Sequence, residues 1–180
     1  MSDTGKLVYK HGNGSLAYKK SGEQAGSLVY KADLGSETTI TFAWGSDGKD
    51  LDICAYWDDA PALKVGYGYN STSGDYSSGA YFISYSGDIR GTDTSEWVRI
   101  IKRPWAGAPT SFTVRLNFYG HDTDHQASTC AVIVSQANGE TKTLFDVPCG
   151  TNGSNRATDA DPGIRVTFDS SGFLDKVETI

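Results

Sequence analysis

The sequence has little of what several large functional classes need. Its 180 residues include 16 Lys and Arg against 22 Asp and Glu, which gives a net charge of −6. Nucleic-acid binders use a basic face to displace counterions from phosphates, so we expect no nucleic-acid partner. No apolar run approaches the ~18–20 residues of a membrane span, and residues 1–5 lack the basic and apolar regions of a signal peptide. We therefore expect a cytoplasmic protein.

Cysteine is also scarce. The three cysteines, Cys54, Cys130 and Cys149, form no Cys-x-x-Cys pair, and zinc and redox motifs need such close pairs. An odd number of cysteines also does not build a disulfide framework. Two interpretations stay open, namely buried free thiols in a reducing compartment or a single Cys130–Cys149 bridge.

Glycine and tyrosine, in contrast, are abundant, with 21 and 10 residues. This composition is typical of short strands joined by tight turns, and the periodic Ala, Leu, Glu and Lys runs of long helices are missing. Residues 1–36 hold three similar units, at 5–10, 14–19 and 26–31, each with Leu and Tyr on one face. We expect them to form an N-terminal three-stranded β-meander.

Residues 37–180 alternate between apolar and polar side chains over longer segments. Such alternation, interrupted by turn residues, predicts an all-β domain, an antiparallel β-sandwich of jelly-roll-like type with one solvated face on each sheet. The predicted strands are 38–44, 51–57, 63–69, 80–85, 96–101, 111–119, 130–134, 142–147 and 164–168.

Two acidic turns are the most informative feature for function. Asp50 and Asp52 are two residues apart on a predicted strand, so both carboxylates point to the same side and repel each other unless a cation lies between them. A second turn carries Asp88, Asp93 and Glu96. Carboxylates on glycine-containing loops are ligands that Ca²⁺ prefers, although Asp is also common in turns for its local hydrogen bonds.

The order of these motifs resembles that of the TerD family of bacterial tellurium-resistance and stress-response proteins. The resemblance covers about residues 37–120 and rests on Trp44, the Asp-Leu-Asp motif at 50–52 with the residues that follow it, the Gly-Tyr-Asn at 68–70, and the Ser-Gly-Asp turn at 86–88 with Glu96. It implies a calcium-binding β-sandwich whose ligands are Asp50, Asp52, Asp88, Asp93 and Glu96.

The sequence departs from the family pattern at three positions of the second turn. Ile89 stands where the family has Asn, and Thr94 and Ser95 stand where it has acids. The N-terminal repeat and the C-terminal third do not follow the family pattern either. The resemblance therefore implies a divergent relative, in which one metal ligand or turn-stabilising amide is replaced.

The sequence does not favour an enzyme. It contains no Gly-x-Ser-x-Gly nucleophile elbow and no glycine-rich phosphate loop before a helix. Neighbouring acids in one turn are also not the opposed carboxylate pair of a glycosidase. The run His121-Asp122-Thr123-Asp124-His125 is either a metal site formed by a folded loop or a solvated turn.

The aromatic residues support an alternative function. Trp44 and Trp97 lie among apolar neighbours and are expected in the core, whereas Trp57 and Trp105 are expected at the surface, where they could stack on sugar rings. The sequence thus predicts a non-enzymatic calcium-binding protein that presents metal-ordered loops to a protein or glycan partner. The alternative is a carbohydrate-binding or adhesin-like module, or a structural protein of a surface or particle.

Overall fold

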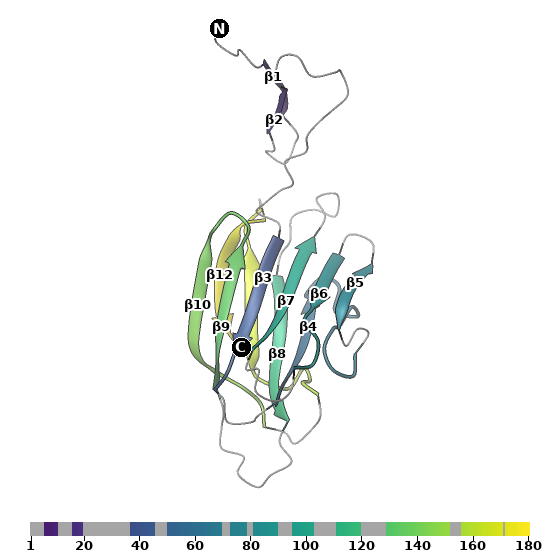
Figure 1. Ribbon diagram of the computed structural model, residues 1–180, viewed down its shortest axis with the longest axis vertical. Coiled ribbons are helices and arrows are strands. Elements are labelled where there is room, and N and C mark those ends of the chain that lie inside the picture. Colours follow the sequence, from purple (N-terminus) through teal and green to yellow (C-terminus); the bar gives the residue numbers. More distant parts are fainter. Residues whose placement is uncertain are drawn as a thin grey trace. The chain divides into compact units, whose positions relative to one another are not determined.

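The computed structural model describes residues 6–10, 16–19, 37–45, 50–69, 73–78, 81–89, 95–102, 111–119, 129–151, 156–170 and 172–180. The chain divides into two compact units, Met1–Leu34 and Gly35–Ile180. All regular elements of the described residues are strands (Figure 1). Within these residues, no helix has the length and apolar character needed to span a bilayer.

The first unit contains one antiparallel pair of strands. β1 (Lys6–Lys10) pairs with β2 (Leu16–Lys19), with Lys6 opposite Lys19 and an irregularity between Leu7 and Tyr9. These strands coincide with the first two sequence units. The third unit, at 26–31, lies outside the described residues, so the three-stranded meander stays a prediction.

The second unit consists of two antiparallel sheets, which confirms the predicted all-β sandwich. The six-stranded sheet has the order β10-β9-β3-β7-β6-β5, and the four-stranded sheet has the order β12-β11-β8-β4. The strands are β3 (Glu37–Ala43), β4 (Asp50–Trp57), β5 (Gly74–Ser78), β6 (Tyr81–Tyr85), β7 (Ser95–Lys102), β8 (Ser111–Tyr119), β9 (Thr129–Gln136), β10 (Thr141–Pro148), β11 (Gly163–Phe168) and β12 (Leu174–Thr179).

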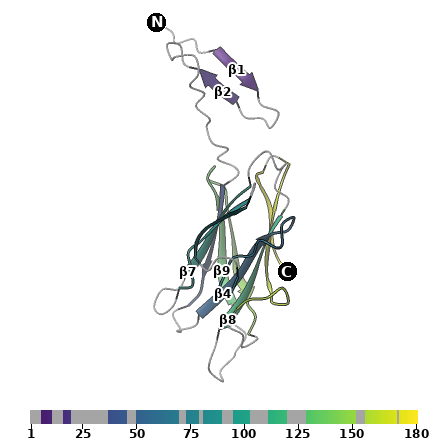
Figure 2. The same ribbon diagram turned by 90° about the vertical axis from the view of Figure 1, so that its right-hand side faces the viewer.

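The two sheets lie face to face as layers, with β7 and β9 in one and β4 and β8 in the other (Figure 2). The hydrophobic core lies between them because each strand turns every second side chain inward. On β3 the burial pattern alternates strictly, with Ile40 and Phe42 fully buried. Both sheets contribute to one continuous cluster of buried side chains.

The predicted strand 63–69 is wrong. Only Val65 pairs, in an isolated bridge with Ala55, and the chain then turns at Gly66 and Gly68, which have φ values of +128° and +75°. At Gly66 an added Cβ would lie 1.9 Å from the carbonyl oxygen of Ile53. The segment therefore reads as a strand from its side chains, but its two glycines turn it into a loop that rests on β4.

Two of the tryptophan predictions are also wrong. Trp57, expected at the surface, is 1% exposed and faces the core from the end of β4. Trp97, expected in the core, is 37% exposed because its neighbours Glu96 and Val98 are the inward residues of β7. Trp105 lies outside the described residues.

Strand β10 forms one edge of the six-stranded sheet and carries a β-bulge. Its register with β9 shifts between Leu144 and Val147, and Asp146, inside the bulge, has a φ of +54°. The shift leaves Phe145 76% exposed while Val147 returns to the core. An extra residue in one strand of a pair bends that strand and increases its twist.

Candidate metal site

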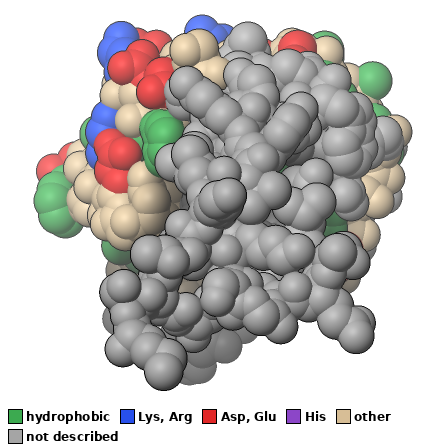
Figure 3. All heavy atoms as spheres, turned by 90° about the horizontal axis from the view of Figure 1, so that it is seen from above, with side chains coloured by type: hydrophobic (Ala, Val, Ile, Leu, Met, Phe, Trp, Pro, Cys, Tyr) green, Lys and Arg blue, Asp and Glu red, His purple; other side chains and the backbone are tan. Residues whose placement is uncertain are grey.

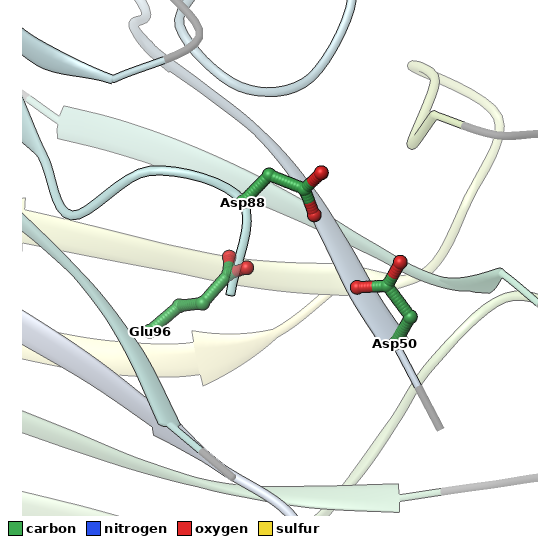
Figure 4. Close-up of side chains that lie close together, drawn as sticks. All are labelled: Asp50, Asp88 and Glu96. Atoms are coloured by element: carbon green, nitrogen blue, oxygen red, sulfur yellow. The ribbon is translucent and has the colours of Figure 1, made fainter. Parts of the chain in front are cut away.

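Three carboxylates from separate segments come together at one place. Asp50 begins β4, Asp88 follows β6, and Glu96 is the second residue of β7. One oxygen of each carboxylate lies within 4.8 Å of the other two, and the three side chains converge in Figure 4. Because β4 belongs to the four-stranded sheet and β6 and β7 to the six-stranded sheet, the cluster connects the two layers.

Glu96 is the most deeply placed of the three residues, with 0% of its surface exposed. Its Oε2 accepts a hydrogen bond of 2.8 Å from the Tyr85 hydroxyl, and its Oε1 accepts one of 3.0 Å from the Ile89 amide. Burial raises the pKa of this carboxyl to about 8, and the nearby negative charges of Asp88 and Asp50 raise it further, whereas the two hydrogen bonds lower it by less than burial raises it. A bound cation would reverse this balance.

Tyr85 is a residue that the sequence analysis did not assign to the site. It is 1% exposed and belongs to the hydrophobic core, and its hydroxyl donates to Glu96. Burial, followed by the Glu96 carboxylate, raises the pKa of Tyr85 far above its ordinary value, so the hydroxyl stays a donor at all physiological pH values. The signal in the sequence was its position on the same face of β6 as Ile83, which marks it as inward-facing.

The oxygen separation suits a single hard cation. Ca²⁺ binds oxygen at about 2.3–2.6 Å, so two ligands on opposite sides of the ion are separated by about 4.8 Å. Each carboxylate oxygen has two lone pairs, so the hydrogen bonds to Glu96 leave room for coordination. Zinc prefers His and Cys ligands, and the cluster contains only carboxylates.

The other two predicted ligands, Asp52 and Asp93, are not part of the three-residue cluster. Asp52 is 3% exposed and lies opposite Asn117 of β8. It is not one of the three clustered residues, although its charge contributes to the raised pKa of Tyr85. Asp93 lies outside the described residues, as do the histidines of the 121–125 run. Asp52 and Asp93 therefore stay predictions, whereas Asp50, Asp88 and Glu96 are brought together.

Ile89 stands where the resemblance would place an Asn, and the structure shows what this position contributes. Its backbone amide, not its side chain, donates to Glu96. An amide is present in every residue except proline, so this contact with the acidic cluster does not depend on the side chain at position 89.

Charged side chains of both signs lie close to each other elsewhere on the molecule. Among the side chains coloured in Figure 3, Lys and Arg lie beside Asp and Glu along one edge.

Comparisons with family models, with curated proteins and with solved structures give no match for this chain. The resemblance to the TerD family therefore rests on the short motifs of residues 37–120 alone.

Proposed function

We propose that this protein is a non-enzymatic calcium-binding β-sandwich, in which Asp50, Asp88 and Glu96 supply ligands to one Ca²⁺ ion. The observation that carries the proposal is that three carboxylate oxygens from three segments lie within 4.8 Å of one another, one of them from a residue with 0% exposure. Crowded carboxylates repel each other, and a divalent cation removes that cost.

Calcium is the cation that this donor set favours. Ca²⁺ accepts six to eight oxygen ligands in flexible geometry, whereas Mg²⁺ requires near-ideal octahedral geometry at about 2.0–2.1 Å. Three carboxylates provide part of such a sphere, and backbone oxygens or water complete it. The predicted ligands Asp52 and Asp93 are candidates for further positions, and we retain them as part of the proposal.

The ion would act by fixing loops. Asp50 begins β4, and Asp88 lies in the connection between β6 and β7, so one ion would tie segments of both sheets together. A surface ordered in this way can bind a partner without the entropic cost of ordering at the moment of binding. This role agrees with the stress-response family that the motifs resemble.

The test is thermal unfolding in EDTA, in excess Mg²⁺ and in excess Ca²⁺. Ligand at a hundred times its Kd stabilises the folded state by about 2.7 kcal/mol, which raises the Tm of a domain of this size by roughly 5–10 °C. We expect this rise with Ca²⁺, a smaller one with Mg²⁺, and none in the double variant Asp50→Asn/Asp88→Asn.

Asp75→Asn is the matched control, because Asp75 is an exposed carboxylate on β5, outside the cluster. This variant should keep the full response to calcium. A wild-type protein that shows no calcium-selective rise, or a double variant that responds as wild type does, would contradict the proposal.

A second candidate function is favoured by one observation. The outer face of the six-stranded sheet displays Trp97 and Ile133, each 37% exposed, on either side of Thr41 in one cross-strand row. An exposed tryptophan on a flat sheet can stack on a sugar ring, and the hydroxyl groups of neighbouring side chains can accept hydrogen bonds from the sugar. Trp97 thus replaces the buried Trp57 as the aromatic residue for the carbohydrate-binding alternative.

A glycan array separates the two functions. Carbohydrate binding would be lost in Trp97→Ala and kept in Phe173→Ala, which removes another exposed aromatic ring, 41% accessible, from the β11–β12 connection. An array on which the wild-type protein binds no glycan removes this second candidate and leaves the calcium proposal untouched.

A further inference from the structure

Two of the three cysteines lie side by side at the end of the β9–β10 hairpin. Cys130 is the second residue of β9 and pairs in register with Val147 of β10, and Cys149 follows two residues later. Their exposed fractions are 3% and 7%, and both belong to the core cluster. No disulfide joins them, and both are free thiols.

The two thiols contact each other. Cys149 Sγ lies 3.6 Å from the carbonyl oxygen of Val147, to which it donates, and Val147 is the residue that pairs with Cys130 across the two strands. The contact with the Cys130 thiol, followed by burial, raises the pKa of Cys149. A disulfide requires two Cα atoms within about 7 Å of each other, a spacing that occurs between neighbouring positions of paired antiparallel strands.

Metal binding does not explain this pair. A structural zinc site needs four ligands, and among the described residues neither cysteine belongs to a group of three or more His, Cys, Asp and Glu side chains with ligand atoms within 4.8 Å of one another. The third cysteine, Cys54, lies on β4 in the other sheet. Cys130 and Cys149 therefore have each other as sulfur partners.

We propose that Cys130 and Cys149 form a disulfide by exchange with a small-molecule disulfide such as oxidised glutathione. The thiolate of one cysteine attacks the glutathione disulfide, which gives a mixed disulfide and releases one glutathione thiolate. The second cysteine loses its proton and attacks the protein sulfur of the mixed disulfide, which releases the second glutathione. The two protein thiols lose two electrons and two protons, and one glutathione disulfide becomes two thiols.

The disulfide would restrain the segment in which the chain crosses from the six-stranded to the four-stranded sheet. Directly after Cys149 the chain passes to the four-stranded sheet, where the Gly150 amide donates to Leu116 and the Gly150 carbonyl accepts from Phe118, both at 2.8 Å. A bridge from Cys130 to Cys149 would fix this crossing point to β9 and restrict the unfolded chain. The site is independent of the acidic cluster.

The experiment exposes the full-length protein to oxidised glutathione, both in its native state and during refolding from denaturant. Intact mass should fall by about 2 Da as two thiol hydrogens are lost, and peptide mapping without reduction should link the Cys130 and Cys149 peptides. The oxidised protein should have a Tm roughly 5–10 °C above that of the reduced protein. The native protein should react more slowly than the refolding chain, because both thiols are buried.

Cys54→Ala is the matched control and should keep both the mass change and the Tm rise, whereas Cys130→Ala should lose both. Peptide mapping of the wild-type protein decides the matter even if Cys130→Ala does not fold. Three alkylatable thiols after refolding in oxidised glutathione, a bridge that includes Cys54, or glutathione attached at Cys130 or Cys149 as the final product would each overturn the proposal.

Discussion

The outer faces of the two sheets differ sharply. On the four-stranded sheet, the outward residues Asp52, Cys54, Thr113 and Asn117 are polar or small, and none is more than 3% exposed. On the six-stranded sheet, outward Trp97 and Ile133 are apolar and each is 37% exposed. One face thus buries polar groups and the other exposes apolar ones, the reverse of what hydropathy alone predicts.

The polar residues on the outer face of the four-stranded sheet are buried because loops pack over that face, which we call the covered face. The loop after β4 returns to that strand through paired backbone hydrogen bonds of 3.0 Å between Val65 and Ala55. It is joined to the 156–161 segment by the Tyr69 hydroxyl, which donates to the carbonyl of Ala157 at 2.6 Å, and by the 2.6 Å ion pair of Lys64 and Asp159. Burial of an outward residue therefore depends on segments distant in sequence, not on the strand that carries it.

The largest expected difference is between Trp57 and Trp97, the two tryptophans whose burial differs from the prediction made from the sequence. Trp57 packs against Phe112, Phe168 and Tyr81 at centroid distances of 5.2, 5.9 and 6.1 Å. We expect Trp57→Ala to lower the free energy of unfolding by about 3–5 kcal/mol, and Trp97→Ala to lower it by less than about 1 kcal/mol. Urea unfolding of both variants measures the difference, and similar losses would contradict the comparison.

The second prediction concerns Glu96, which is buried between the sheets rather than on an outer face. Its pKa is raised to about 8 in the folded protein, from an ordinary value of 4.5. In EDTA, the folded protein thus keeps a proton that the unfolded chain has released, and stability falls as pH rises through this interval. Between about pH 5 and about pH 7.5 the loss should be roughly 3 kcal/mol, and it should level off above about pH 8.

Urea unfolding across this pH range measures the effect. Glu96→Gln should flatten the profile because its side chain does not titrate, whereas Asp75→Asn, a change of an exposed carboxylate on β5, should keep the slope. A wild-type protein that gains stability from pH 5 to 7.5 in EDTA would show that Glu96 is ionised in the fold without metal.

The prediction with the smallest expected change in the free energy of unfolding compares one ion pair on each outer face. Asp58, at the covered face, accepts hydrogen bonds from Ser111 and Thr113 at 2.5 and 2.6 Å and pairs with Arg165 at 3.1 Å. We expect Asp58→Asn to cost about 1–2 kcal/mol, because donors in the covered face lose their charged acceptor.

The other ion pair joins Arg99 and Glu37 on the outer face of the six-stranded sheet, which we call the open face. The two side chains are separated by 3.7 Å, and each is 42% exposed. Glu37→Gln should cost less than about 0.5 kcal/mol, because water screens the pair and replaces its contacts. Denaturant unfolding of both variants at one salt concentration is the measurement. If Glu37→Gln proved the more costly change, the open face would not be open in solution.

Much of the fold could be predicted from the sequence because inward side chains repeat every second residue. This signal located β3, β7 and β8 well. It missed β5, whose sequence Gly-Asp-Tyr-Ser-Ser carries a single large apolar side chain, and β12, where the exposed residues outnumber the buried one. Both are edge strands, which pack on one side only and therefore carry a weak pattern.

The sequence predicts that the candidate site consists of carboxylates, but it does not predict which of the acidic residues come together. The acidic turns indicated Asp50, Asp88 and Glu96, since carboxylates near strand ends can meet across a sandwich. Nothing in the spacing separated Asp52 from these three, because period two places it on the same side of β4 as Asp50. The role of Tyr85 depends on the packing of β6 against the core, which no short motif records.

The bulge in β10 bears on how the protein behaves at high concentration. A straight edge strand with regularly spaced amide and carbonyl groups invites strands of other molecules to add to the sheet. In β10 the register shifts at Phe145 and Asp146, and Pro148 has no amide hydrogen to donate. The edge that carries the exposed Phe145 ring therefore offers a poor template for fibril growth, so the sheet can keep an open apolar face without polymerising along this edge.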